Sequence, residues 1–180
     1  MYKHSIFLRE AQTPKETKVV QDPTSNEEER EKLLEYFRTS IADEFLAAFQ
    51  YRQGYNVASG EHKADIENEM NSHYFEELGH AEKLEERLKQ IGGKTFGPDK
   101  WKEYTRAGYT EPPEDGNCLQ ITIDNIEGEK KAVSYYREFA EFANKIGDYG
   151  TVNLVEGILA DEEKHLHEFE ELRKQFVDEN

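Results

Sequence analysis

The chain has 180 residues, about the length of one domain, and its composition excludes several classes of protein. Acidic residues outnumber basic ones by 39 to 23, which gives a formal net charge of -16, and apolar residues make up only 36%. This balance argues against general binding to nucleic acids, because phosphate contacts require Lys and Arg, and it favours cations as partners. Aromatic residues still reach 12%, which predicts a folded core despite the charge.

The sequence carries no signal for a membrane or for an oxidising compartment. Its longest apolar run, at 45–49, is far too short to span a bilayer, and the residues after Met1 lack the apolar segment of a secretory signal. The single cysteine, Cys118, permits neither an internal disulfide nor a cysteine-based metal cage. We therefore expect a cytoplasmic protein without a membrane partner.

Residues 1–26 lack a clear period and are predicted to form an N-terminal extension, whereas residues 27–177 are predicted to form one helical domain. Apolar residues in this domain recur at steps of three, four or seven, which is the period of a helix. The pattern predicts four long helices, at about 27–56, 61–90, 119–146 and 151–176. Short turns join the first two and the last two, but residues 91–118 separate the middle pair. We therefore expect an all-α four-helix bundle with one long crossover.

The crossover is predicted to contain a short extra helix at about 99–106, begun by Pro98. Trp101 and Tyr104 would lie on it, and two large aromatic groups on a short exposed helix usually mark a contact. Trp101 could fold back on its own bundle. We expect instead that it lies at an interface between subunits.

Polar residues that interrupt the apolar helix faces are the most informative part of the sequence. They are Glu44 on the first helix, Glu77 and His80 on the second, Glu129 on the third, and Glu162 and His165 on the fourth. These faces should be buried, and a buried carboxylate is costly unless it is paired or bound to a metal.

The spacing of these residues repeats along the chain. Thirty-three residues separate Glu44 from Glu77, and the same number separates Glu129 from Glu162. The midpoint of each pair falls in or beside the turn of its hairpin, so the two members of a pair lie at the same height in the bundle. A single Glu-x-x-His means little on so acidic a helix. The repetition of the whole pattern is what predicts four carboxylates and two imidazoles at one level of the core.

One Glu from each of two helices, with Glu-x-x-His from the other two, is the ligand set of di-iron and di-manganese carboxylate bundles. Carboxylate oxygens bind Fe(II), Fe(III) and Mn(II) and can bridge two ions, and imidazole adds one ligand to each ion. We expect two iron ions per subunit at these six residues, with manganese or zinc able to replace them.

The neighbours of the six residues have several interpretations. Tyr51 and Tyr136, each seven residues after a Glu of the set, are either ordinary core residues or groups that hydrogen-bond a ligand or donate an electron. His73 is expected to be a core residue or a partner of a ligand rather than a ligand, and His167 is expected at the surface. The adjoining acidic residues are expected to be solvated or to contact a ligand, and they are Glu76, Glu127, Asp161 and Glu163.

In these motifs the chain resembles the ferritin superfamily. The stretch from Glu44 to Tyr51 resembles the first-helix motif of bacterioferritins and mini-ferritins, and Glu77-Leu-Gly-His80 and Glu162-Glu-Lys-His165 resemble their two Glu-x-x-His motifs. The segment that begins at Glu129 resembles their third-helix ligand region. The short crossover helix and the lack of a fifth helix resemble Dps-like mini-ferritins, which form twelve-subunit shells and keep a bacterioferritin-type site inside each subunit.

Two departures from these families change what the resemblance implies. A subgroup of Dps-like proteins carries a cysteine pair near the site, but the matching positions here are Ala107 and Lys131, so no thiol role is expected. Bacterioferritins bind haem through a Met beside the second-helix motif. Here Leu78 follows Glu77, so no haem is expected.

The resemblance implies a ferroxidase that protects against oxidative stress. Hydrogen peroxide or dioxygen would take electrons from two Fe(II) ions together, and the Fe(III) would be stored in a homo-oligomeric, dodecameric cage. The residues assigned to this reaction are Glu44, Glu77, His80, Glu129, Glu162, His165 and Tyr51.

Two alternatives remain open from the sequence. A rubrerythrin-like peroxidase or a manganese catalase would use a similar site without storage, although no Cys-x-x-Cys pair exists for a rubredoxin centre. A Dps-type shell protein would protect DNA, but the basic residues of 1–26 have only a weak excess over the acidic ones, so DNA binding is not expected.

Overall fold

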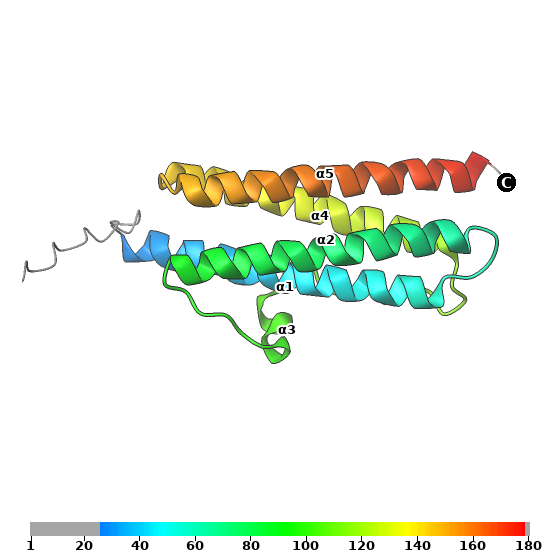
Figure 1. Ribbon diagram of the computed structural model, residues 1–180, viewed down its shortest axis with the longest axis horizontal. Helices are drawn as coiled ribbons and strands as arrows, with labels where there is room; N and C mark the ends of the chain where they lie inside the picture. Colours follow the sequence, from blue (N-terminus) through cyan, green and yellow to red (C-terminus); the bar gives the residue numbers. More distant parts are fainter. Residues whose placement is uncertain (1–25, 179–180) are drawn as a thin grey trace, which may run out of the picture.

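The computed structural model describes residues 26–178, which form two helical hairpins packed side by side (Figure 1). The four long helices are α1 (Glu27–Val57), α2 (Lys63–Gln90), α4 (Cys118–Lys145) and α5 (Tyr149–Asp178). Each begins and ends within about two residues of its predicted bounds, which confirms the four-helix bundle. Residues 1–25 of the predicted N-terminal extension lie outside the described part of the chain.

Local sequence explains where the helices begin. Asn26 caps α1 by accepting a hydrogen bond of 3.0 Å from the backbone N–H of Glu28, and a run of glutamates follows where the helix dipole favours negative charge. Asp148 precedes α5 and accepts hydrogen bonds from the backbone N–H and the hydroxyl of Thr151. The same carboxylate lies 2.6 Å from the guanidinium of Arg87 in α2, so the start of α5 is tied to the first hairpin.

The crossover from α2 to α4 passes along the outside of α1, because α2 and α4 run in the same direction and the chain must return to the far end (Figure 1). It contains a 3-10 turn at Pro98–Lys100 followed by the short helix α3 (Trp101–Tyr104). The predicted extra helix is therefore confirmed but ends two residues early. It ends there because the hydroxyl of Thr105 and the backbone N–H groups of Arg106 and Ala107 bind the carboxylate of Asp43 in α1.

Trp101 folds back on its own bundle. Its ring stacks on Phe45 of α1, with the ring centroids 5.2 Å apart and an interplanar angle of 13°. The expectation that Trp101 would lie at a subunit interface instead of on its own bundle is therefore corrected, because Phe45 offers an apolar partner within the same chain. Contact of its remaining exposed edge with another subunit stays a prediction.

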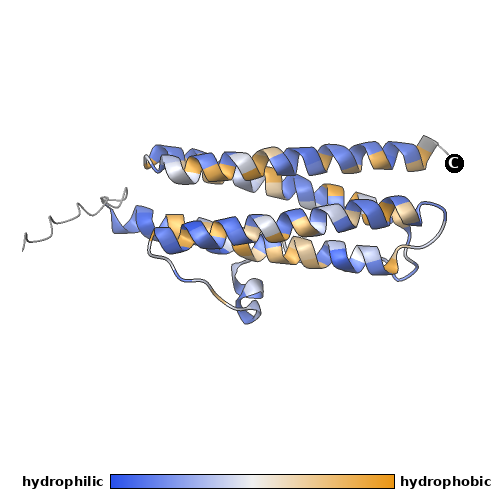
Figure 2. Cartoon of the chain, in the orientation of Figure 1, coloured by the Kyte–Doolittle hydropathy of each residue, from blue (hydrophilic) through white to orange (hydrophobic). Residues whose placement is uncertain are grey.

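The apolar core consists of two clusters separated along the bundle axis. The first contains Leu33, Leu34, Phe37, Ile41, Leu84, Leu88, Tyr136, Phe139, Val155 and Ile158. The second contains Tyr51, Ala58, Ile66, Met70, Cys118, Ile121, Ile126, Phe169, Leu172 and Phe176. Figure 2 shows hydrophobic and hydrophilic residues alternating along each long helix, as expected for helices that bury one face. None of the helices within residues 26–178 has an apolar stretch long enough to cross a membrane.

Gly116 joins the end of the crossover to the turn between α1 and α2. Its φ is 69°, and its carbonyl accepts a hydrogen bond of 3.0 Å from the backbone N–H of Ser59. A Cβ at this position would lie 2.0 Å from the carbonyl oxygen of Val57. Both the conformation and the space therefore require glycine.

Replacing Gly116 by alanine should lower the free energy of unfolding by about 1–3 kcal/mol, because the backbone is strained and the Val57 carbonyl must move. Gly157→Ala is the matched control, since a Cβ there meets nothing within 4 Å on α5. It should change the free energy of unfolding by less than about 1 kcal/mol, in the stabilising direction. Urea denaturation of both variants measures the difference, and equal midpoints would contradict this account.

Candidate metal centre

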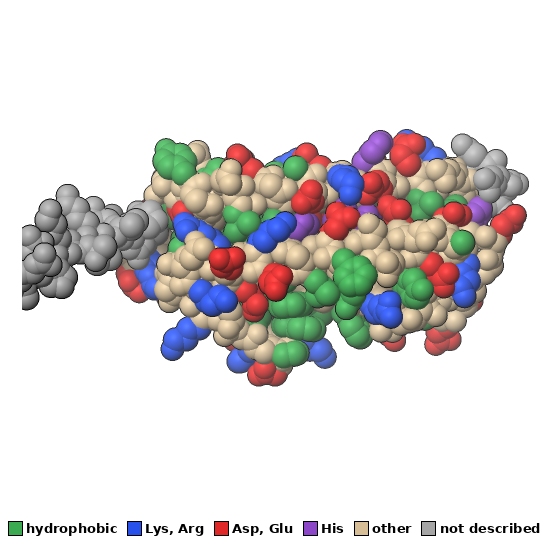
Figure 3. All heavy atoms as spheres, in the orientation of Figure 1, with side chains coloured by type: hydrophobic (Ala, Val, Ile, Leu, Met, Phe, Trp, Pro, Cys, Tyr) green, Lys and Arg blue, Asp and Glu red, His purple; other side chains and the backbone are tan. Residues whose placement is uncertain are grey.

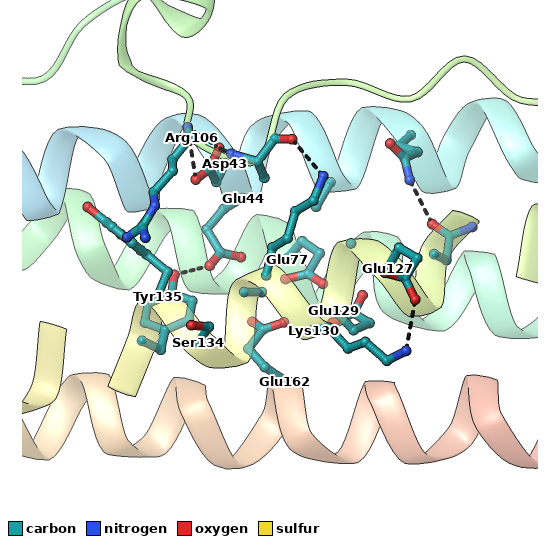
Figure 4. A pocket seen from close by; sticks show the side chains of 18 of the residues that line it. Asp43, Glu44, Glu77, Arg106, Glu127, Glu129, Lys130, Ser134, Tyr135 and Glu162 are labelled. Atoms are coloured by element: carbon teal, nitrogen blue, oxygen red, sulfur yellow. Dashed lines mark hydrogen bonds and ion pairs between the residues drawn. The ribbon is translucent and has the colours of Figure 1, made fainter. Parts of the chain in front are cut away.

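The six side chains predicted from the sequence meet between the two core clusters. They are Glu44, Glu77, His80, Glu129, Glu162 and His165, and none is more than 4% exposed. Figure 4 shows the four carboxylates pointing toward one another from α1, α2, α4 and α5. The antiparallel register of each hairpin therefore brings the predicted residues to one level, as their spacing indicated.

These side chains form two groups of four potential ligands, and the groups share Glu77 and Glu162. One group adds Glu44 and His80, and the other adds Glu129 and His165. In each group, one ligand atom from every residue lies within 4.8 Å of the others. Each group therefore offers three carboxylates and one imidazole, a donor set suited to a divalent transition metal.

Glu77 and Glu162 each direct one oxygen to each group. Nδ1 of His80 lies 3.1 Å from Oε2 of Glu77 and 3.2 Å from Oε1 of Glu162. Nδ1 of His165 lies 3.3 Å from Oε1 of Glu77 and 3.7 Å from Oε2 of Glu162. Two ligands of one ion with bonds of 2.0–2.2 Å are separated by about 3.0–3.5 Å. Glu77 and Glu162 would therefore be shared between the two groups if each group held a metal ion.

The residue before each shared glutamate holds the histidine of the opposite hairpin. Oδ2 of Asp161 lies 3.1 Å from Nε2 of His80, and Oε2 of Glu76 lies 3.2 Å from Nε2 of His165. Such pairs fix the imidazole ring and leave Nδ1 for a metal. Of the two roles expected for Glu76 and Asp161, contact with a candidate ligand is the one observed. The other adjoining residues are exposed, as expected, and they are Glu127, Glu163 and His167.

Two buried tyrosines hold the remaining carboxylates across the hairpins. Tyr51 of α1 donates a hydrogen bond to Oε1 of Glu129 in α4, and Tyr136 of α4 donates one to Oε1 of Glu44 in α1. Hydrogen bonding to a candidate ligand is therefore the role that the structure shows for both. The spacing of seven residues marked these tyrosines in the sequence, but it gave no sign that each would contact the other hairpin.

Burial and mutual repulsion change the protonation of the carboxylates. Burial, together with the charges of Glu77 and Glu162, raises the pKa of Glu44 well above its usual range. Burial and the charge of Glu162 raise the pKa of Glu129 in the same way. In contrast, hydrogen bonds from His165 and His80 outweigh the effect of burial at Glu77 and lower its pKa.

The two histidines are held in their protonated form by the same carboxylates. Burial would lower the pKa of His165, but hydrogen bonds with Glu162 and Glu77 outweigh it and raise the pKa to about 12. Hydrogen bonds with Glu162 and Glu44 outweigh burial at His80, so its pKa also rises. Protons on the two imidazoles therefore offset part of the negative charge of the centre, and a metal must displace them.

A cavity of about 430 Å³ reaches the centre from the side formed by α1 and α4. Its lining includes Glu44, Glu129 and Arg106 (Figure 4). Tyr51 and Lys131 also line it. Nζ of Lys131 lies 3.3 Å from the carbonyl oxygen of Ala107. A hydrogen bond therefore joins Lys131 to Ala107, the two residues at which the sequence offered no cysteine.

A four-helix bundle with two buried Glu-x-x-His motifs and two further buried glutamates defines the class of dinuclear metal carboxylate proteins. The family model of the ferritin-like domain matches residues 34–177, and the chain belongs to this family. A bacterioferritin from Rhodobacter capsulatus is 25% identical over 136 residues, which cover 75% of this chain and 78% of that protein. A bacterioferritin from Desulfovibrio desulfuricans is 23% identical over 149 residues, which cover 82% and 78%.

Solved structures show the same fold. A dodecameric, bacterioferritin-related thioferritin from Bacteroides fragilis aligns with a TM-score of 0.79 and 29% identity, over 83% of this chain and 88% of that chain. Dps from Thermosynechococcus elongatus aligns with a TM-score of 0.78 and 17% identity, over 83% and 94% of the two chains. At 17% identity, the likeness to Dps from Thermosynechococcus elongatus concerns the fold alone.

Metal binding at the centre should release protons, because His80 and His165 must lose theirs to act as ligands, and the raised pKa values of Glu44 and Glu129 add to the release. We expect Zn(II) binding at neutral pH to release roughly one to two protons per ion and the affinity to fall as the pH is lowered. Calorimetric titrations in buffers of different ionisation enthalpy measure the release. The control is Glu127→Gln, which removes an exposed carboxylate outside the centre and should bind Zn(II) and release protons as the wild type does. Binding without proton release, or tighter binding in acid, would contradict the assignment.

Proposed function

We propose that this protein is a ferroxidase that oxidises Fe(II) at a dinuclear centre inside each subunit and stores the Fe(III) in a homo-oligomeric cage. The observation that carries the proposal is the sharing of Glu77 and Glu162 between two groups of ligands, which would hold two ions close enough to react together. The membership of the ferritin-like family and the relatives named bacterioferritin support iron as the substrate.

Each residue of the centre has a separate role in this proposal. Glu44 and His80 would hold one Fe(II), Glu129 and His165 the other, and Glu77 and Glu162 both. Glu76 and Asp161 keep the imidazole rings in place, and the hydroxyls of Tyr51 and Tyr136 position the two terminal carboxylates. Manganese or zinc would fit the same donors, and no haem is required.

The electron count favours a pair of ions over a single one. Hydrogen peroxide takes one electron from each of two Fe(II) ions and, with two protons, becomes two water molecules. Dioxygen takes the same two electrons and, with two protons, becomes hydrogen peroxide. Because the two electrons leave together, no hydroxyl radical is released, which is how the activity would protect against oxidative stress. The cavity on the α1–α4 side offers a small oxidant a route to the centre.

Storage requires a closed assembly, and the structural likeness supports one. The thioferritin from Bacteroides fragilis, with a TM-score of 0.79, is described as dodecameric. We propose the same assembly for this chain, in the cytoplasm and without DNA or a membrane as partner. The net charge of -16 would help to attract Fe(II) to such a particle.

Removing a ligand should abolish rapid oxidation while the bundle stays folded. Glu44→Ala and His165→Ala should each slow Fe(II) oxidation at least tenfold, since even the outer partners of metal ligands contribute about 10–100-fold. Stopped-flow absorbance of Fe(III) measures the rate, and far-UV circular dichroism checks the fold. Glu163→Ala, an exposed neighbour of Glu162, is the control and should keep the wild-type rate. Wild-type rates in both ligand variants would refute the centre.

The mass of the particle decides between storage and simple removal of peroxide. Sedimentation of the wild-type protein should give an assembly of about twelve subunits of 21.0 kDa, and added iron should sediment with it. A monomer or dimer that oxidises Fe(II) and precipitates it outside the protein would refute storage. That result would favour a rubrerythrin-like peroxidase or a manganese catalase, which needs the centre but no cavity in an assembly.

A further inference from the structure

A further group of metal-binding side chains lies beside the dinuclear centre, between α2 and α5. It consists of Glu69 and His73 of α2 and Glu168 of α5, which we call the seam cluster. One ligand atom from each of the three lies within 4.8 Å of the others, and none of the three belongs to the two groups described above. Figure 3 shows acidic side chains gathered along the boundary between these two helices.

The distances within the seam cluster are those of a metal site. Nε2 of His73 lies 3.1 Å from Oε2 of Glu168 and 3.3 Å from Oε1 of Glu69. These separations match the value of about 3.0–3.5 Å expected between neighbouring ligands of one ion. Nε2 can carry only one hydrogen, yet two carboxylates from different helices approach it. A divalent cation among the three atoms would satisfy both carboxylates at once.

The imidazole of His73 is held in place by packing. Its side chain is only 1% exposed, and its ring stacks on that of His165 with the centroids 4.0 Å apart. The ring of Phe169 meets it edge-on at 4.9 Å. Nδ1 of His73 is buried and has no hydrogen-bond partner, which is costly for a polar atom. The packing of the ring therefore leaves Nδ1 unpaired and places Nε2 between the two carboxylates.

The internal repeat of the chain shows that the fold itself does not require these residues. An offset of 85 residues relates the two hairpins, since it separates Glu44 from Glu129, Glu77 from Glu162 and His80 from His165. The same offset leads from the seam cluster to residues of other types. Leu154 occupies the position equivalent to Glu69, and Ile158 the position equivalent to His73. Lys83 occupies the position equivalent to Glu168. The positions related to the seam cluster by this offset therefore carry two apolar residues and one basic residue in place of metal-binding ones.

We propose that Glu69, His73 and Glu168 bind one divalent transition-metal ion, separate from the dinuclear pair. Two carboxylates and one imidazole suit Fe(II), Mn(II) and Zn(II). Three protein ligands leave coordination positions for water, so this ion should exchange more readily than ions held by four protein ligands. The seam cluster lies on the α2–α5 side, whereas the cavity reaches the centre from the α1–α4 side. The proposal does not depend on the oxidation of iron.

The test uses Zn(II) as the probe and the intact protein. Anomalous diffraction at the zinc edge should show three ions per chain in the wild type, one of them among Glu69, His73 and Glu168. The double variant Glu69→Gln and Glu168→Gln should show two, with the pair unchanged. Calorimetric titration should show the same loss of one site in solution. The control is the double variant Glu67→Gln and Glu170→Gln, which removes equal charge from the same helices and should keep three ions.

The outcomes separate this proposal from the proposed function. Two ions in the wild type, a third ion located elsewhere, or a third ion retained by the seam double variant would each overturn the seam site and leave the dinuclear centre intact. An ion in the seam cluster without the dinuclear pair would support the seam site and count against the ferroxidase.

Discussion

The main electrostatic cost in this structure comes from four carboxylates that are buried at one level of the helical bundle, and the surrounding residues offset this cost. Each has lost most of its hydration, and each repels the others. The imidazoles of His80 and His165 lie among them, and the hydroxyls of Tyr51 and Tyr136 bind the two carboxylates that are not shared. The apolar clusters on either side hold the four helices together, so the polar layer does not have to stabilise the bundle by itself.

The crossover is held beside this layer of carboxylates by Asp43. Asp43 is the neighbour of Glu44 in α1, and its half-buried carboxylate accepts hydrogen bonds from the backbone N–H groups of Arg106 and Ala107. Burial raises the pKa of Asp43. The segment that lines the cavity is therefore anchored next to a candidate ligand. A change in the crossover can thus affect access to the centre without touching any of its six residues.

The two sides of the centre carry different groups. The cavity opens on the α1–α4 side, where Arg106, Lys130 and Lys131 line it together with the acidic residues Asp43 and Glu127. The α2–α5 side carries Glu69, Glu76, Asp161 and Glu168, and Nζ of Lys164 lies 3.4 Å from Oε2 of Glu76. Under the proposed function, a small neutral oxidant would use the cavity, because the charges of its lining do not repel a neutral molecule.

The sequence by itself determined the four helices, the long crossover and the six residues that meet in the core. Helical period and turns are local properties, and equal distance from a turn places Glu44 level with Glu77. The sequence could not show that Glu77 and Glu162 are the shared residues, that Tyr51 reaches Glu129, or that Trp101 stacks on Phe45. Those contacts join segments that are far apart in the chain. Only the packing of one hairpin against the other, and of the crossover against α1, decided them, because side-chain reach between helices depends on their relative rotation and separation.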